Sequence, residues 1–217
     1  MVVRIEAMGA GAIWSRWRLW AAGCDFCGYV IHDVRMRFRD HVSRNLSPAV
    51  NHWIDLSPPV GWMSCCTDIS VVTDHSRGAA VFRDSNNRVC CVWIERFAAT
   101  DPSLAEAQML VCAAQVAVRN RFLCVSFFCD NTEVVSTFLE ADRQNRNLNL
   151  DGAAMMFRNC TKGFQSFKLT SIGREANFMA HNAAKWAKFN SVVGEIDLRV
   201  MDPEVFVDHK EWYPEPG

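Results

Sequence analysis

Hydrophobic and polar positions divide the chain near the Ser-Pro-Pro segment at residues 57–59. Before it, Trp14, Trp17 and Trp20 recur every three residues, which fits one face of a helix. A Ser-Pro pair then opens a helical stretch over residues 47–56, and the two prolines end any helix. We therefore predict that residues 1–57 form a partly helical leader, a candidate for mobility.

Beyond residue 58 the hydrophobic period switches between strand and helix. Five segments have the alternating or continuous apolar pattern of strands, namely residues 62–72, 78–83, 89–98, 121–130 and 165–172. Four segments have helical periodicity, namely residues 101–120, 131–142, 151–161 and 175–189. We predict a polar loop at residues 143–150. Three meandering strands followed by strand–helix units predict one mixed α/β sheet with helices packed on it.

Composition and charge narrow the class of protein. Half of the 217 residues are hydrophobic and 22% are charged, as in a globular domain with one sizeable core. No apolar run reaches about eighteen residues, so we expect no membrane span. The ten cysteines lie mostly within apolar runs and no export signal is evident. We therefore expect reduced thiols in an intracellular compartment, nucleus or cytoplasm, and a monomer.

The charge is uneven along the chain although the net charge is only −1. Residues 143–188 carry eight basic residues against two acids, and residues 193–217 carry seven acids against two bases. We predict that residues 193–217 form an acidic C-terminal tail. The basic stretch either faces an anionic partner or is a solvated surface.

Three carboxylates fall at the edges of the predicted elements. Asp68 lies in the first strand, Glu106 near the start of the first long helix, and Asp130 at the end of the fourth strand. If the first and fourth strands are neighbours, the three carboxylates converge. Such like charges repel unless cations lie between them. Because Mg²⁺ prefers oxygen ligands, the cluster predicts a metal site.

Two of these acids have a simpler explanation. Glu106 completes a capping box with Ser103, and Asp130 with Glu133 forms a second helix start. Asp68 has no such explanation, because no helix begins after it. An unpaired acid inside an apolar strand is costly, so Asp68 is the residue that favours a functional site.

Several segments together resemble the plant-type RNase H-like, reverse-transcriptase-like domain of non-LTR retrotransposon products. They are PPVGWMSCCTDIS, GAAVFRDSNNR, LAEAQMLVCAAQVA, VSFFCDNTEVVSTF and GREANFMAHNAAKWA, within residues 58–192. The resemblance implies an RNase H-like fold with a five-stranded mixed sheet in the order 3-2-1-4-5 and helices on both faces. It implies that Asp68, Glu106 and Asp130 bind two Mg²⁺ or Mn²⁺ ions and cleave the RNA strand of an RNA–DNA hybrid.

The chain departs from the family pattern at four positions. Ile69 replaces a glycine after the first acid, and only Gly78 remains of a Gly-x-Gly pair. Ser171 stands where active enzymes often have a histidine, and His181 stands where they have a fourth acid. We count His181 with the candidate catalytic residues; its alternative is a helix-surface histidine.

Two functions follow from the resemblance. The first is an RNase H-type nuclease that acts on RNA–DNA hybrids or RNA. The second is an inactive RNase H-like domain that serves as a nucleic-acid-binding or protein-interaction module, which Ile69 and His181 favour. In either case the candidate nucleic-acid contacts are Arg158, Lys162, Arg174, Asn177, Lys185 and Lys188.

Overall fold

The computed structural model of the protein describes residues 56–139, 148–207 and 210–214. The leader predicted for residues 1–57 lies almost wholly outside this part of the chain, including its tryptophan face and its second helical stretch. Its boundary with the following domain therefore stays a prediction.

One mixed sheet organises the described residues. Its strands are β1 (Met63–Val71), β2 (Ser76–Arg83), β3 (Val89–Phe97), β4 (Cys124–Cys129), β5 (Ser166–Ser171) and β6 (Gly194–Glu195). They lie in the order β5-β4-β1-β2-β3-β6. The first five strands confirm the predicted order 3-2-1-4-5. The two-residue β6 was not predicted; it pairs with β3 and comes from the acidic C-terminal segment.

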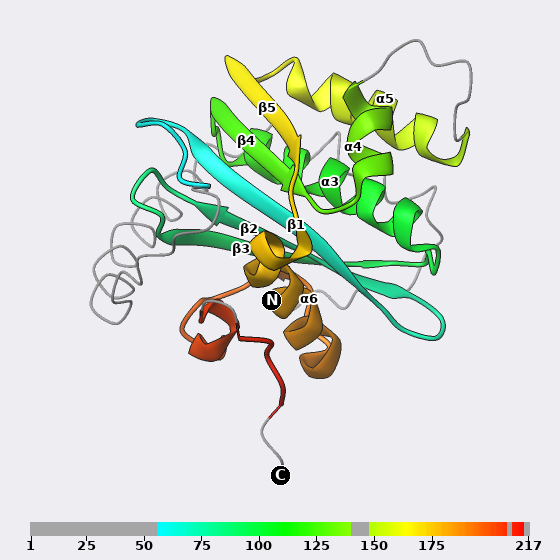
Figure 1. The fold of residues 1–217 in the computed structure, drawn as a ribbon, viewed down its shortest axis with the longest axis vertical. Coiled ribbons are helices and arrows are strands. Elements are labelled where there is room, and N and C mark those ends of the chain that lie inside the picture. The colour runs from blue at the N-terminus through cyan, green and yellow to red at the C-terminus, as the bar shows by residue number, and fades with distance from the viewer. Residues whose placement is uncertain (1–55, 140–147, 208–209, 215–217) are drawn as a thin grey trace, which may run out of the picture. The chain divides into compact units, whose positions relative to one another are not determined.

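Helices cover both faces of the sheet, as predicted (Figure 1). The first three are α3 (Pro102–Arg119), α4 (Thr132–Leu139) and α5 (Leu148–Thr161), and α6 (Phe178–Asn190) lies on the opposite face. Two short 3₁₀ turns, η1 (Arg174–Asn177) and η2 (Pro203–Phe206), precede and follow α6. In the described part of the chain, no helix combines the length and apolar character that a bilayer span requires.

The predicted loop at residues 143–150 is wrong at its end. Leu148, Asn149 and Leu150 form the first turn of α5, and the Leu150 side chain is fully buried. The free energy gained by burying Leu150 against the core stabilises this helical turn, although its polar neighbours give only a weak helical pattern.

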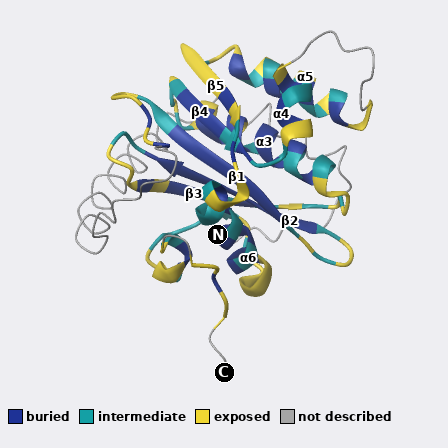
Figure 2. Cartoon of the chain, in the orientation of Figure 1, coloured by how far each residue is buried: buried dark blue, intermediate teal, exposed yellow. Residues whose placement is uncertain are grey.

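Side chains along β1 point alternately to the two faces of the sheet. Cys65 and Ile69 lie in the hydrophobic cluster beneath α3 and α5, whereas Cys66 lies in the cluster beneath α6. Figure 2 shows the central strands as mostly buried. Asp68 lies two positions from Cys66 and therefore points to the α6 face.

The β1–β2 ladder places Ile69 opposite the glycine that the sequence retains. Ile69 pairs directly with Gly78 on β2. A Cβ atom at Gly78 would collide with the Met109 side chain of α3 and lie 2.8 Å from Cε2 of Phe97. The missing side chain at Gly78 thus lets α3 approach the sheet closely beside Ile69.

The C-terminal segment packs against α6. Met201, Val205 and Trp212 are buried in the hydrophobic cluster on that face of the sheet. The buried Asn182 side chain donates hydrogen bonds from Nδ2 to the carbonyl oxygens of Val205 (3.2 Å) and Lys210 (2.8 Å). Hydrophobic burial and these bonds hold the segment in place.

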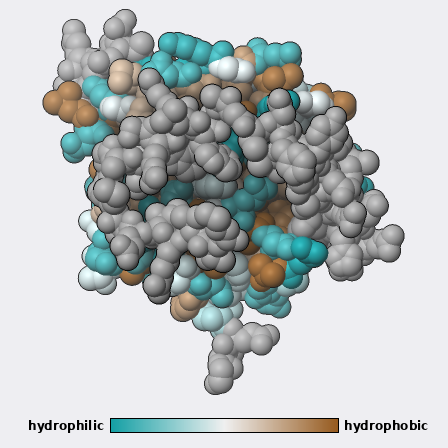
Figure 3. Space-filling model, turned by 180° about the vertical axis from the view of Figure 1, so that it is seen from behind, coloured by the Kyte–Doolittle hydropathy of each residue, from teal (hydrophilic) through white to brown (hydrophobic). Residues whose placement is uncertain are grey.

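The described surface mixes hydrophilic and hydrophobic side chains (Figure 3). Its exposed large apolar residues belong to different elements, among them Val118, Leu148 and Phe189. Scattered apolar side chains are ordinary on a folded surface. The functional assignment therefore rests on polar residues.

Replacing Gly78 by alanine should destabilise the domain. The added Cβ overpacks the contact with Met109 and Phe97, so we expect a loss of about 1–3 kcal/mol in the free energy of unfolding. Gly152→Ala in α5 is the control, since no atom lies within 4 Å of the position that a Cβ would take there and alanine favours a helix. Urea unfolding measures both. Equal stability of Gly78→Ala and wild type would contradict the packing account.

Candidate active site

Parallel pairing of β1 with β4 brings two of the candidate acids together. Thr67 pairs with Cys129, so Asp68 and Asp130 follow these partners at the same edge of the sheet. Ser171 pairs with Cys129 from the other side and lies at this edge as well. The neighbouring strands on which the sequence argument depended are therefore present.

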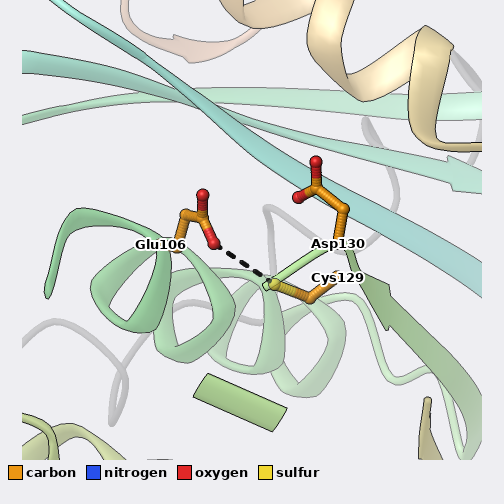
Figure 4. A group of neighbouring side chains, drawn as sticks. All are labelled: Glu106, Cys129 and Asp130. Atoms are coloured by element: carbon orange, nitrogen blue, oxygen red, sulfur yellow. Dashed lines mark hydrogen bonds between the residues drawn. The ribbon is translucent and has the colours of Figure 1, made fainter. Parts of the chain in front are cut away.

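Glu106 reaches this edge from α3. Figure 4 shows its side chain directed toward Cys129 and Asp130. One ligand atom from each of Glu106, Cys129 and Asp130 lies within 4.8 Å of the others, and Cys129 Sγ lies 3.7 Å from Glu106 Oε2. Sequence reasoning missed Cys129, because a cysteine in an apolar strand is typical of a core residue.

The predicted capping roles of Glu106 and Asp130 are wrong. Asp101 caps α3, since its Oδ1 accepts a hydrogen bond from Leu104 N at 2.8 Å. Asn131 caps α4 in the same way, with Oδ1 accepting from Glu133 N at 3.0 Å. Ser103 Oγ instead contacts the Glu133 carboxylate. The simpler explanation of both acids is thereby removed.

Burial and the crowding of negative charge raise the pKa values of Glu106 and Asp130. Burial, followed by the charges of Asp130 and Asp68, raises the pKa of Glu106 to about 7. Burial and the charge of Asp68 also raise the pKa of Asp130, although Arg174 opposes this effect. Asp130 Oδ1 is buried and accepts no hydrogen bond from any described residue. Burial and mutual repulsion therefore favour the protonated forms of Glu106 and Asp130 when no cation is bound.

Asp68 has two hydrogen-bond donors of its own. The residue is 4% exposed. Its Oδ1 accepts from the backbone N of Ile69 at 2.6 Å, and its Oδ2 accepts from Nδ1 of His181 at 3.0 Å. The hydrogen bond to Asp68 raises the pKa of His181. His181 therefore faces the carboxylate cluster from α6.

The candidate nucleic-acid contacts on η1 and α6 surround His181. Arg174 is exposed, with Nη2 lying 3.5 Å from Nδ1 of His181. Lys185 follows one helical turn after His181, and Lys188 is exposed further along α6. Asn177 is fully buried and donates from Nδ2 to Thr67 O at 2.9 Å, which ties η1 to β1 beside Asp68.

The structure does not bring Arg158 and Lys162 to the carboxylates. Arg158 lies in the last turn of α5, and Lys162 directly follows that helix. The chain then enters β5, whose first residue pairs with Cys124. The acids lie beyond Cys129, five positions along β4, which is about 17 Å at ~3.3 Å per residue. Arg158 Nη1 donates to Phe138 O, and Lys162 Nζ donates to Asn159 Oδ1.

Comparison with protein families identifies the class of this domain. The family model described as reverse transcriptase-like matches residues 66–187, more than half of the chain. The match runs from β1 through α6 and includes Asp68, Glu106, Asp130 and His181. The chain therefore belongs to the reverse transcriptase-like family. No curated protein sequence matches it.

Solved structures show the same fold at low sequence identity. RNase H1 of Halobacterium salinarum has a TM-score of 0.54 at 18% identity, over 59% of this chain and 98% of its own. An RNase H1 isolated from compost has a TM-score of 0.53 at 14% identity, over 61% and 99%. The N-terminal RNase H domain of a Mycobacterium tuberculosis protein gives 0.51 at 14% identity, over 60% and 99%. The described domain thus has the RNase H-like fold.

The raised pKa of Glu106 predicts how stability depends on pH without metal. Stability from protonated Glu106 is fully present below its ordinary pKa near 4.5 and is lost as pH rises through about 7. From pH 5 to pH 8, wild type should therefore lose about 1–3 kcal/mol relative to Glu106→Gln.

Urea unfolding in EDTA at several pH values measures this difference. The control is Glu175→Gln, which removes an exposed acid on η1 outside the cluster. It should not reproduce the pH dependence of Glu106→Gln. Stability curves for wild type and Glu106→Gln that run parallel between pH 5 and pH 8 would contradict the crowded-charge account.

Proposed function

We propose that residues 58–192, with the acidic segment docked on them, form a metal-dependent ribonuclease. It would hydrolyse the RNA strand of an RNA–DNA hybrid. The observation that carries the proposal is that Glu106 and Asp130 meet beside Cys129, with Asp68 close enough to raise the pKa of both, while other residues cap the adjoining helices. A carboxylate cluster that is not needed for the fold is best explained by cations.

The donor set fits hard divalent ions. Asp68, Glu106 and Asp130 offer carboxylate oxygens, which Mg²⁺ and Mn²⁺ prefer, and the buried Oδ1 of Asp130 is available for a cation. When bound, two such ions activate water and stabilise the leaving oxygen in phosphodiester hydrolysis. Asp68, Glu106 and Asp130 are the residues that would hold them.

The chain's own residues prepare this site in distinct ways. His181 orients Asp68 through the 3.0 Å hydrogen bond, and Asn177 fixes η1 against β1. Arg174 offsets part of the charge of Asp130. Arg174, Lys185 and Lys188 would contact phosphates near the site, while Arg158 and Lys162 could contact only a more distant part of a substrate. These charge and shape contacts suit a hybrid duplex or RNA.

A second function has its own supporting observation. Both carboxylate oxygens of Asp68 already accept hydrogen bonds, one of them from the histidine that replaces the family's fourth acid. Imidazole is a poor ligand for Mg²⁺. An inactive domain that binds nucleic acid or a protein partner is therefore the alternative.

Cleavage of an RNA–DNA hybrid labelled on the RNA strand tests the proposal. With Mg²⁺ or Mn²⁺, wild type should cleave the RNA, and Asp130→Asn should lose roughly 10²–10⁴ in rate because cation binding is lost. Glu133→Gln, an exposed acid at the start of α4, serves as control and should retain the activity.

Two outcomes would reject the nuclease. No cleavage with either ion by folded protein that still binds the hybrid would support the binding module. Equal cleavage by wild type and Asp130→Asn would show that the carboxylate cluster is not the active site.

A further inference from the structure

Part of the acidic C-terminal segment lies beside the candidate active site. Residues 210–214 run along α6 (Figure 1). Trp212 anchors them: it is 4% exposed, its backbone N donates to Asn182 Oδ1 at 3.0 Å, and its Nε1 donates to Asp202 Oδ2 at 2.6 Å. This anchor places the preceding residue, Glu211, over the exposed side of α6.

Glu211 is held by two basic side chains of α6. Its Oε1 accepts from Lys185 Nζ at 2.7 Å and lies 3.7 Å from His181 Nε2. Tyr213 donates to Oε2 at 2.9 Å, and its ring lies beneath Lys185 Nζ, 3.6 Å from the ring centroid. The hydrogen bond from Lys185 is the main reason that the pKa of Glu211 falls to about 2.

The imidazole ring of His181 lies between the Glu211 carboxylate and Asp68. His181 contacts Asp68 through Nδ1 and faces Glu211 through Nε2, so one imidazole ring separates Glu211 from the carboxylate cluster. Lys185 was a candidate nucleic-acid contact and His181 a candidate catalytic residue. An ammonium and an imidazole that together hold one anionic group at the rim of a nuclease site also suit a phosphate.

We propose that His181 and Lys185 form a binding site for a backbone phosphate of the nucleic acid, and that Glu211 occupies it until the nucleic acid displaces the carboxylate. The C-terminal segment would thereby lower the affinity of the domain for its substrate. The identity of the ligand as nucleic acid rests on the proposed function.

The contacts of Glu211 permit this exchange without undocking the segment. Trp212, Val205 and Asn182 supply the buried contacts that hold the segment on α6. The Glu211 side chain is 50% exposed, and exposed ion pairs contribute little to stability. The side chain can therefore turn away while the backbone stays in place.

Hybrid binding by the full chain in EDTA tests the proposal without turnover. Fluorescence anisotropy of a labelled RNA–DNA hybrid would compare wild type with Glu211→Gln. The control is Glu204→Gln, which removes an equally exposed acid (56%) from the same segment and frees Lys210 from its 2.7 Å pair. We expect Kd to fall roughly fivefold for Glu211→Gln and to change less than about twofold for Glu204→Gln.

Lys185→Ala, made both in wild type and in Glu211→Gln, tests whether Lys185 is the group that Glu211 blocks. In the Glu211→Gln background it should abolish the gain in affinity, whereas in wild type the loss of affinity should be smaller, because there the phosphate must first displace Glu211 from Lys185. The slope of log K against log salt should also steepen, by up to about 0.9, in Glu211→Gln, because phosphate binding then no longer releases a carboxylate that takes up a salt cation. Urea unfolding checks that each variant is folded.

The outcomes separate this inference from the nuclease proposal. Tighter binding by Glu211→Gln without cleavage by any variant would support the phosphate site and reject the nuclease. Cleavage with equal affinities for Glu211→Gln and Glu204→Gln would do the reverse. Weaker binding by Glu211→Gln would mean that Glu211 positions Lys185 for substrate, and no hybrid binding by any folded variant would mean that there is no phosphate site; both would overturn the inference.

Discussion

Repulsion among three carboxylates is the constraint on which the functional end of this domain depends. Parallel pairing of β1 with β4 places Asp68 and Asp130 at one sheet edge, and the close packing of α3 on β2 brings Glu106 to them. Burial removes much of the water that would otherwise screen the repulsion between these charges. The pKa values of Glu106 and Asp130 rise as a result. Divalent cations bound at the proposed site would offset this electrostatic cost.

Basic side chains of η1 and α6 lie beside these acids. His181 contacts Asp68 directly, Arg174 offsets Asp130, and Lys185 stands one turn further along the helix. The C-terminal segment adds an outer acidic layer, because Glu211 binds Lys185 and faces His181. Together, His181 and Lys185 thus contact both an acid of the site and an acid of the C-terminal segment, which lies beyond the family match at residues 66–187.

Particular residues show where sequence reasoning succeeded and where it failed. Asp68 stood out because an acid inside an apolar strand has no local explanation, and the structure places it at the cluster. The capping boxes failed because Asp101 and Asn131, nearby in the chain, cap the helices instead. A capping pattern specifies residue types, but the point at which the backbone enters the helix selects among them. Cys129 and β6 were missed because a buried thiol and a two-residue edge strand leave no periodic signal.

The sequence by itself determined the succession of strands and helices, because periodicity is a local property. The strand order came from the resemblance to a family, and the positions of Asp68, Glu106 and Asp130 in the predicted elements made them candidates. Tertiary structure decided which neighbours those acids have. It directed His181 at Asp68, placed Arg158 and Lys162 away from the cluster, and laid Glu211 over Lys185. These contacts join positions such as 68 with 181 and 185 with 211. Only the packing of α6 and the C-terminal segment on the sheet brings such positions within hydrogen-bonding distance, since no local pattern encodes a contact between distant parts of a chain.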